Sequence, residues 1–107
     1  MGWAVTEFVV VLCTAPAGGA ENIAKALVEE RLAACVNVGA VRSYFIWEEK
    51  LCKDAEELLI IKTEQRMAER LMARIRELHS YQLPEMIMLK IAGGDERYLQ
   101  WIGQSVG

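Results

Sequence analysis

Two short, unbroken apolar runs constrain the fold of this chain most, at residues 8–13 and 58–61. The first reads Phe-Val-Val-Val-Leu-Cys and the second reads Leu-Leu-Ile-Ile. Runs of this length that are rich in β-branched residues are typical of strands paired on both edges. Proline and glycine within residues 15–19 oppose continuation of the first run. We therefore expect a sheet whose central strands cover residues 7–14 and 51–63.

Two stretches between the expected strands have the spacing of amphipathic helices, at residues 20–33 and 65–79. Their apolar residues recur three and four positions apart, which places them on one helix face. A third helix is expected at residues 95–104, with Asp95 as its N-cap. The inward side chains of this last helix are expected to be Tyr98, Leu99 and Ile102.

Two further extended segments complete the pattern. The first covers residues 34–47, and Gly39 within it predicts a bulge or bend. A polar turn at residues 48–50 then joins it to the next strand, which makes a hairpin longer than a small sheet requires. The second covers residues 85–91 and is entered at Pro84, since proline is tolerated at the start of a strand. An apolar edge strand of this kind needs a partner to cover it.

The order of elements is β-α-β-β-α-β with an added C-terminal helix. This order predicts an α+β, ferredoxin-like fold with an antiparallel sheet and two packing helices. Right-handed crossovers place the first and third strands in the middle and the second and fourth at the edges. A length of 107 residues fits one domain, residues 1–107. Residues 1–6 show no pattern, and we expect a short, weakly ordered start.

Composition excludes several classes of function. The formal net charge of -3 argues against a nucleic-acid partner, which needs a basic face. No apolar run approaches the length of a membrane span, and no secretory signal is visible. An odd number of cysteines, 3, without a signal peptide fits free thiols in a reducing cytoplasm. No nucleophile, base and orienting group can be assembled from one histidine and scattered thiols, so we expect no enzyme.

Soft and borderline side chains offer the only candidate metal ligands. Copper prefers thiolate, imidazole and thioether donors, and the chain provides Cys13, Cys35, Cys52 and His79. No ligand pair has a metal-binding spacing, so a site must be assembled from distant segments. On the residues alone, the favoured interpretations are a small core side chain for Cys13 and a helix end stabilised by the dipole for His79.

Six motifs in sequence order resemble the CutA divalent-cation tolerance family over nearly the whole chain. They include Val-Leu-Cys-Thr-Ala-Pro at 11–16, Glu-Leu-Leu-Ile-Ile-Lys-Thr at 57–63 and His-Ser-Tyr-Gln-Leu-Pro-Glu at 79–85. The others lie at residues 30–37, 43–47 and 98–101. The resemblance implies a ferredoxin-like fold, a homotrimer built by strand pairing, a cytoplasmic location, and a link to copper and other heavy metals. One departure is Glu49, where the family usually has glycine at the hairpin turn.

The resemblance also points to specific residues. Cys13 and His79 match the positions associated with copper in the family, and they are the candidate metal ligands. A second candidate site is a pocket between subunits formed by Trp47, Lys62, Tyr81 and Glu85. For Lys62, a structural ion pair with a nearby glutamate is the alternative.

Two functions from different classes remain open at this point. The first is a trimeric protein that binds copper or other divalent cations. The second is a trimeric signalling or interaction protein that binds a small metabolite or a protein partner, with indirect effects on metals. A metal analysis of protein purified without added metal separates them.

Overall fold

A computed structural model describes residues 7–107 as three helices and one four-stranded sheet. Residues 1–6, and the weakly ordered start expected there, lie outside the described part. The elements in chain order are β1 (Phe8–Pro16), α1 (Ala20–Glu29), β2 (Cys35–Trp47), β3 (Lys50–Glu64), a 3₁₀ turn (Gln65–Met67), α2 (Ala68–Leu78), β4 (Ile87–Lys90) and α3 (Glu96–Ser105).

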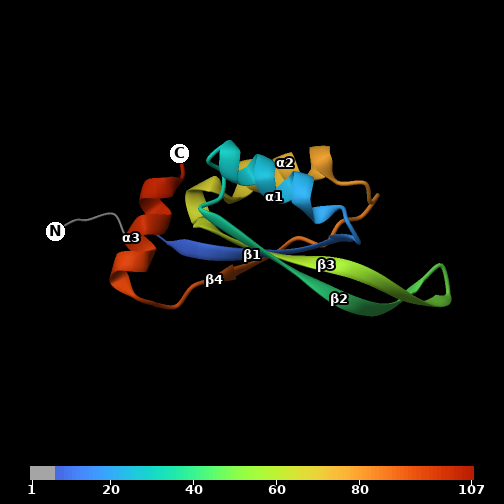
Figure 1. Ribbon diagram of the computed structural model, residues 1–107. Helices are drawn as coiled ribbons and strands as arrows, with labels where there is room; N and C mark the ends of the chain where they lie inside the picture. The colour runs from blue at the N-terminus through green and yellow to red at the C-terminus, as the bar shows by residue number, and fades with distance from the viewer. Residues whose placement is uncertain (1–6) are drawn as a thin grey trace.

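The sheet has the order β2-β3-β1-β4, and every neighbouring pair is antiparallel. This order confirms the expected fold, with the two unbroken apolar runs in the central strands. Helices α1 and α2 lie together on one face of the sheet, and α3 lies at the end opposite the hairpin tip (Figure 1). The β2–β3 hairpin projects well beyond the helices, so the chain measures 55 × 25 × 21 Å.

The core lies between the sheet and its helices. Successive side chains of β1 point alternately into this core and to the opposite face of the sheet. Side chains at every second position, beginning with Val9, are buried, and those between them are only half-buried. The inward residues of β1 face Leu59 and Ile61 of β3 in the same register. Leu27 of α1 and Leu71 of α2 close this core, and both are fully buried. The other face of the sheet carries no helix.

Helix α1 ends at Glu29, four residues before the predicted end at residue 33. Arg31 adopts a left-handed conformation with φ 60°. The N–H of Leu32 donates to the Leu27 carbonyl at 2.9 Å, and that of Arg31 donates to the Val28 carbonyl at 3.0 Å. This is a Schellman ending, which usually has glycine at the left-handed position. Without a glycine, the sequence carried no signal for the end of the helix.

The predicted interruption of β2 at Gly39 is wrong. Gly39 pairs with Leu58 in an unbroken register that runs from Cys35 to Trp47. Its position meets nothing within 4 Å of an added Cβ, so neither a bend nor a close neighbour explains the glycine. The hairpin closes through Glu48 and Glu49, whose φ angles are 50° and 66°. Two-residue turns of this kind favour Asn-Gly because both residues need positive φ.

Two strand boundaries and the exposure of one side chain in the last helix differ from the predictions. Strand β1 continues to Pro16, because β4 pairs only as far as Leu12 and leaves that edge of β1 open beside the proline. Strand β4 is shorter than expected, at Ile87–Lys90. In α3, Asp95 does cap the helix by accepting from the N–H of Tyr98 at 3.0 Å. However, the Tyr98 side chain is 44% exposed rather than inward.

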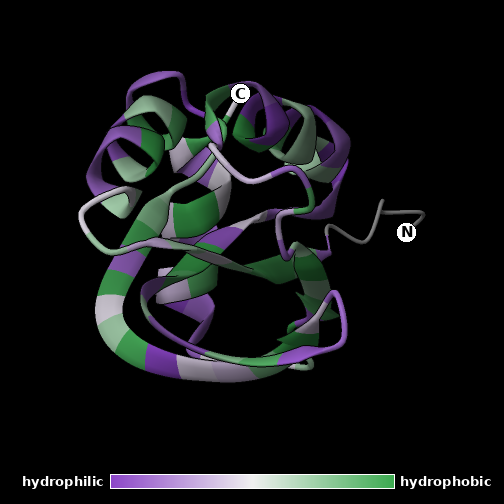
Figure 2. Ribbon diagram, turned by 90° about the vertical axis from the view of Figure 1, so that its right-hand side faces the viewer, coloured by the Kyte–Doolittle hydropathy of each residue, from purple (hydrophilic) through white to green (hydrophobic). Residues whose placement is uncertain are grey.

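Much of the apolar surface lies on the edge strand and the hairpin tip, away from the helices. Ile87, Met88 and Leu89 of β4 are all exposed, and Ile46 and Leu51 near the tip are 66% and 75% exposed. Apolar and polar segments alternate along the hairpin, with no helix over it (Figure 2). None of the helices in residues 7–107 has the length and apolarity needed to cross a membrane.

Candidate functional site

A cavity of about 810 Å³ lies beside the outer half of the projecting hairpin. Three parts of the chain line it: Thr14 near the end of β1, residues 43–47, 54 and 56 of the hairpin, and residues 80–83 and 85 of the loop between α2 and β4. We call it the hairpin cavity. Because side chains alternate along a strand, Thr14 points to the face of β1 opposite Cys13. The cavity therefore lies on the face without helices.

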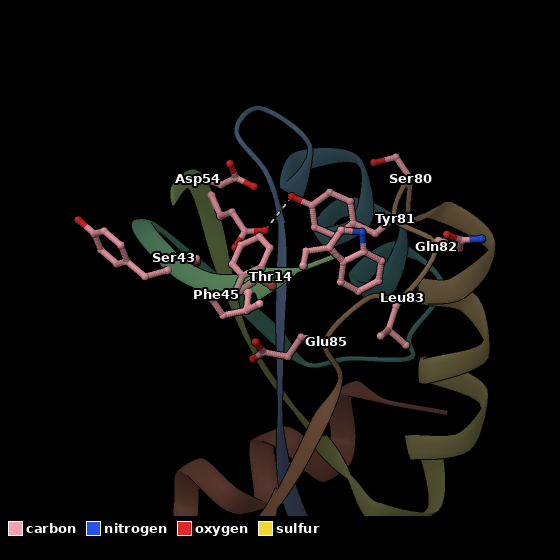
Figure 3. A pocket seen from close by; sticks show the side chains of 13 residues that line it. Thr14, Ser43, Phe45, Asp54, Ser80, Tyr81, Gln82, Leu83 and Glu85 are labelled. Atoms are coloured by element: carbon pink, nitrogen blue, oxygen red, sulfur yellow. Dashed lines mark hydrogen bonds between the residues drawn. The ribbon is translucent and has the colours of Figure 1, made fainter. Parts of the chain in front are cut away.

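A hydrogen bond between Tyr81 and Glu56 joins the loop to the hairpin across this cavity. The Tyr81 hydroxyl donates to Glu56 Oε2 at 2.7 Å, the bond drawn as a dashed line from Tyr81 in Figure 3. Glu56 is only 6% exposed, which is unusual for a carboxylate. Burial and the Glu56 carboxylate together raise the pKa of Tyr81 to about 12. Tyr81 therefore stays a neutral donor at physiological pH.

His79 fixes the start of the same loop through both of its ring nitrogens. The backbone N–H of Tyr81 donates to Nδ1 at 3.0 Å, so this nitrogen is an acceptor. Nε2 then carries the proton of the neutral ring, and it donates to the Thr14 carbonyl at 2.7 Å. The ring also lies against the Tyr81 ring, with centroids 4.8 Å apart. Neither nitrogen has a lone pair available for a metal in this arrangement.

Cys13 is fully buried in the core on the helix side of β1. Its thiol contacts the Thr14 carbonyl oxygen at 3.7 Å, the same oxygen that His79 contacts. Burial raises the pKa of the Cys13 thiol to about 11, and the Glu85 and Glu56 carboxylates contribute to this rise. Copper binds the thiolate, so this environment opposes the form that a metal needs. Cys13 and His79 are thus brought near one another but do not form a ready metal site.

Three of the four residues predicted for the pocket line the hairpin cavity: Trp47, Tyr81 and Glu85. Lys62 does not. It lies six residues beyond Glu56 along β3, roughly 20 Å at the rise of a strand. Its Nζ approaches Cys35 Sγ at 3.9 Å. Among the described residues it makes no ion pair, so the predicted pairing with a glutamate is absent within one chain.

The sequence-based prediction missed two acidic members of the cavity, Asp54 and Glu56. Their spacing of two places them on one face of a strand, and this signal is visible in the sequence. What it did not show is that the loop carrying Tyr81 folds over that face. No group of three or more histidine, cysteine or acidic side chains within residues 7–107 is arranged to hold a metal ion.

Residues 9–105 match the family model of the CutA1 divalent ion tolerance protein. The chain belongs to this family. The divalent-cation tolerance protein CutA of Thermus thermophilus is 45% identical over 100 residues, which are 92% of this chain and 97% of that protein. The chloroplastic protein CutA of Arabidopsis thaliana is 44% identical over 99 residues. That match covers 91% of this chain but 54% of the longer plant protein.

Solved structures of CutA proteins have the same fold. The Thermus thermophilus structure superposes with a TM-score of 0.89 at 43% identity, over 94% of this chain and 99% of that one. The PII-like protein CutA from Nostoc sp. PCC 7120, in its apo form, gives a TM-score of 0.89 at 34% identity. The match covers 92% of this chain and 97% of the Nostoc chain. The family resemblance and the ferredoxin-like fold are therefore confirmed.

Proposed function

We propose that this divalent-cation tolerance protein works as a homotrimer in which neighbouring chains cover the edge strand and the hairpin tip. The observation that carries the proposal is the apolar surface of both elements. Leu89 of β4 is 49% exposed, and Trp47 at the hairpin tip is 46% exposed. A head-to-tail contact between two such different surfaces forms a closed ring when the rotation suits it.

Within this trimer we propose a binding protein rather than an enzyme, with the hairpin cavity as its ligand site. The cavity volume lies in the range of small-molecule sites, roughly 300–1,000 Å³. His79 is the only histidine, and both of its ring nitrogens are engaged. It therefore offers no free base for catalysis. This arrangement supports the metabolite-binding alternative more directly than a preformed copper centre.

Copper binding at Cys13 and His79 is the second candidate function. It is favoured by one observation, the contact of both side chains with the Thr14 carbonyl. A copper ion would have to displace a proton from the buried thiol and break a hydrogen bond of the ring. We therefore propose a weak to moderate site, whose apparent affinity falls as protons compete for the ligands.

Copper titration distinguishes these two functions. Wild type is compared with Cys13→Ser and His79→Ala, and Cys35→Ser and Cys52→Ser are the controls because a free thiol also captures copper. Loss of binding only in the first two variants supports the copper site. Loss only in the Cys52 variant shows nonspecific thiol chemistry and leaves the binding protein as the function.

We also propose a reducing compartment such as the cytoplasm. The three cysteines, Cys13, Cys35 and Cys52, are all free thiols, which suits such a compartment. The name of the Arabidopsis relative places that protein in the chloroplast, so relatives differ in location. Fractionation of the source cells tests the proposal, and recovery of the protein in an oxidising compartment would contradict it.

A further inference from the structure

The lining of the hairpin cavity is acidic. Asp54, Glu56 and Glu85 all belong to it, and among residues 7–107 no lysine, arginine or histidine does. None of the three carboxylates takes part in an ion pair within this described part of the chain. In Figure 3 the Glu85 side chain extends below Phe45, and the Tyr81 hydroxyl donates to the Glu56 carboxylate. The charge of this cavity is therefore not neutralised by the chain itself.

The carboxylates of this cavity lack a counter-charge from the described part of the chain, and their field favours a positive charge that enters the cavity.

Part of the remaining wall is aromatic. Phe45, Trp47 and Tyr81 line the cavity, and cations bind favourably over aromatic faces. The carboxylates attract a positively charged ligand and disfavour an anion. The aromatic rings offer apolar contact area, from which a bare metal ion gains nothing.

A divalent metal ion is also a poor match on geometry. Calcium takes about six to eight oxygen ligands, and the described residues present no cluster of three acidic, histidine or cysteine side chains that could hold a metal. A cavity of about 810 Å³ is far larger than one ion needs. Volume, charge and aromatic walls together therefore fit an organic molecule that carries positive charge.

We propose that the hairpin cavity binds a small organic cation, a primary or secondary amine of metabolite size. Its ammonium group faces the carboxylates of Glu56 and Glu85, and its carbon skeleton packs on Phe45 and Tyr81. The proposal deepens the proposed function, on which it rests, because it names the chemical class that the binding protein takes.

Calorimetric titration of the full chain with defined probes tests the proposal. Benzylamine and 1,4-diaminobutane are the cations, benzyl alcohol and 1,4-butanediol are their neutral counterparts, and succinate is the anion. We expect both amines to bind at least about tenfold more tightly than the neutral probes, and succinate not to bind. Glu56→Gln and Glu85→Gln should each weaken amine binding about tenfold. Glu69→Gln in the first turn of α2 is the matched control and should bind as wild type.

Three results would overturn the proposal. One is equal binding of amines and neutral probes, and another is amine binding unchanged in both cavity variants. The third is Mn²⁺ binding that excess amine does not displace and that the cavity variants lose. Glu85 is exposed in the single chain, so Glu85→Gln remains informative even if Glu56→Gln fails to fold. Sedimentation of the same samples separates amine binding from the trimeric state. A trimer that does not bind amines contradicts this inference alone, whereas a monomer contradicts the proposed function.

Discussion

The two faces of the central sheet are completed in different ways. On the helix face, Val9, Val11 and Cys13 of β1 are fully buried by α1 and α2 of the same chain. On the other face and along the hairpin, Glu56 is buried by a loop, while Ile46 and Trp47 near the tip remain exposed. One face is thus complete within a single chain, and the other needs further chains or ligands. We infer that the first carries stability and the second carries assembly and binding.

The largest expected effect comes from a change on the helix face. Leu59→Ala removes a fully buried side chain of β3 from the core between the sheet and the helices, and it should lower the free energy of unfolding by about 2–5 kcal/mol. Leu58→Ala, on the opposite face of the same strand, is the matched control and should cost clearly less. Urea unfolding at a fixed protein concentration measures both. Equal losses would mean that the two faces do not differ in this way.

A change at the hairpin tip should affect assembly rather than folding. Trp47→Ala should weaken the association of chains by about 2–4 kcal/mol, the range of a buried interface aromatic. Val28→Ala on α1, which is 42% exposed and distant in the fold from the tip, is the control. Dissociation is followed by dilution with size-exclusion detection. If the Trp47 variant assembles as well as the control, the interface does not include Trp47 and lies elsewhere.

The buried thiol predicts how stability depends on pH. Burial raises the pKa of Cys13 from 9.0 to about 11 in the folded chain. The folded state therefore holds its proton more tightly than the unfolded state, and stability falls as pH rises from 9 to 11. The contribution is about 2–3 kcal/mol. Unfolding of wild type, Cys13→Ala and Cys52→Ala across this interval isolates it, because only the Cys13 variant should have a flatter profile.

The smallest expected effect is at the hairpin turn. Glu49 has φ 66°, and a left-handed conformation costs a non-glycine residue roughly 1–2 kcal/mol. Glu49→Gly should therefore raise stability by about 0.5–1 kcal/mol, after allowance for the extra entropy of glycine in the unfolded chain. Thermal midpoints of the variant and of Glu69→Gly in helix α2, which should be destabilised, provide the comparison. A lower midpoint for Glu49→Gly would contradict the turn geometry.

The sequence predicted the helix face better than the open face, for physical reasons. Strand order and core followed from apolar periodicity, because burial by the chain's own helices leaves a regular pattern in residues such as Leu59 and Ile61. The cavity depends on Tyr81 reaching Glu56 across separate segments, and no local pattern encodes that contact. Likewise, the ending of α1 rests on a left-handed Arg31, a conformation that its residue type does not signal.

The sequence pointed to the two candidate metal ligands, but it did not show the hydrogen bonds that engage them. The resemblance placed Cys13 and His79 together, and both do contact the Thr14 carbonyl. Whether the imidazole is free depends on the backbone N–H of Tyr81, which donates to Nδ1. Such backbone partners cannot be read from residue types. Lys62 lies away from the hairpin cavity within one chain, because its distance along β3 separates it from Glu56. Its place in a pocket between subunits stays a prediction.

The trimer is the central claim, and sedimentation equilibrium at low micromolar concentration tests it most directly. Three chains that cover each other's edge strand and hairpin tip should sediment as a single species of three times the 12.0 kDa chain mass. The mass should stay constant on dilution through this range, because an interface of this apolar character is expected to be obligate. A stable species of 12.0 kDa under the same conditions would contradict the account.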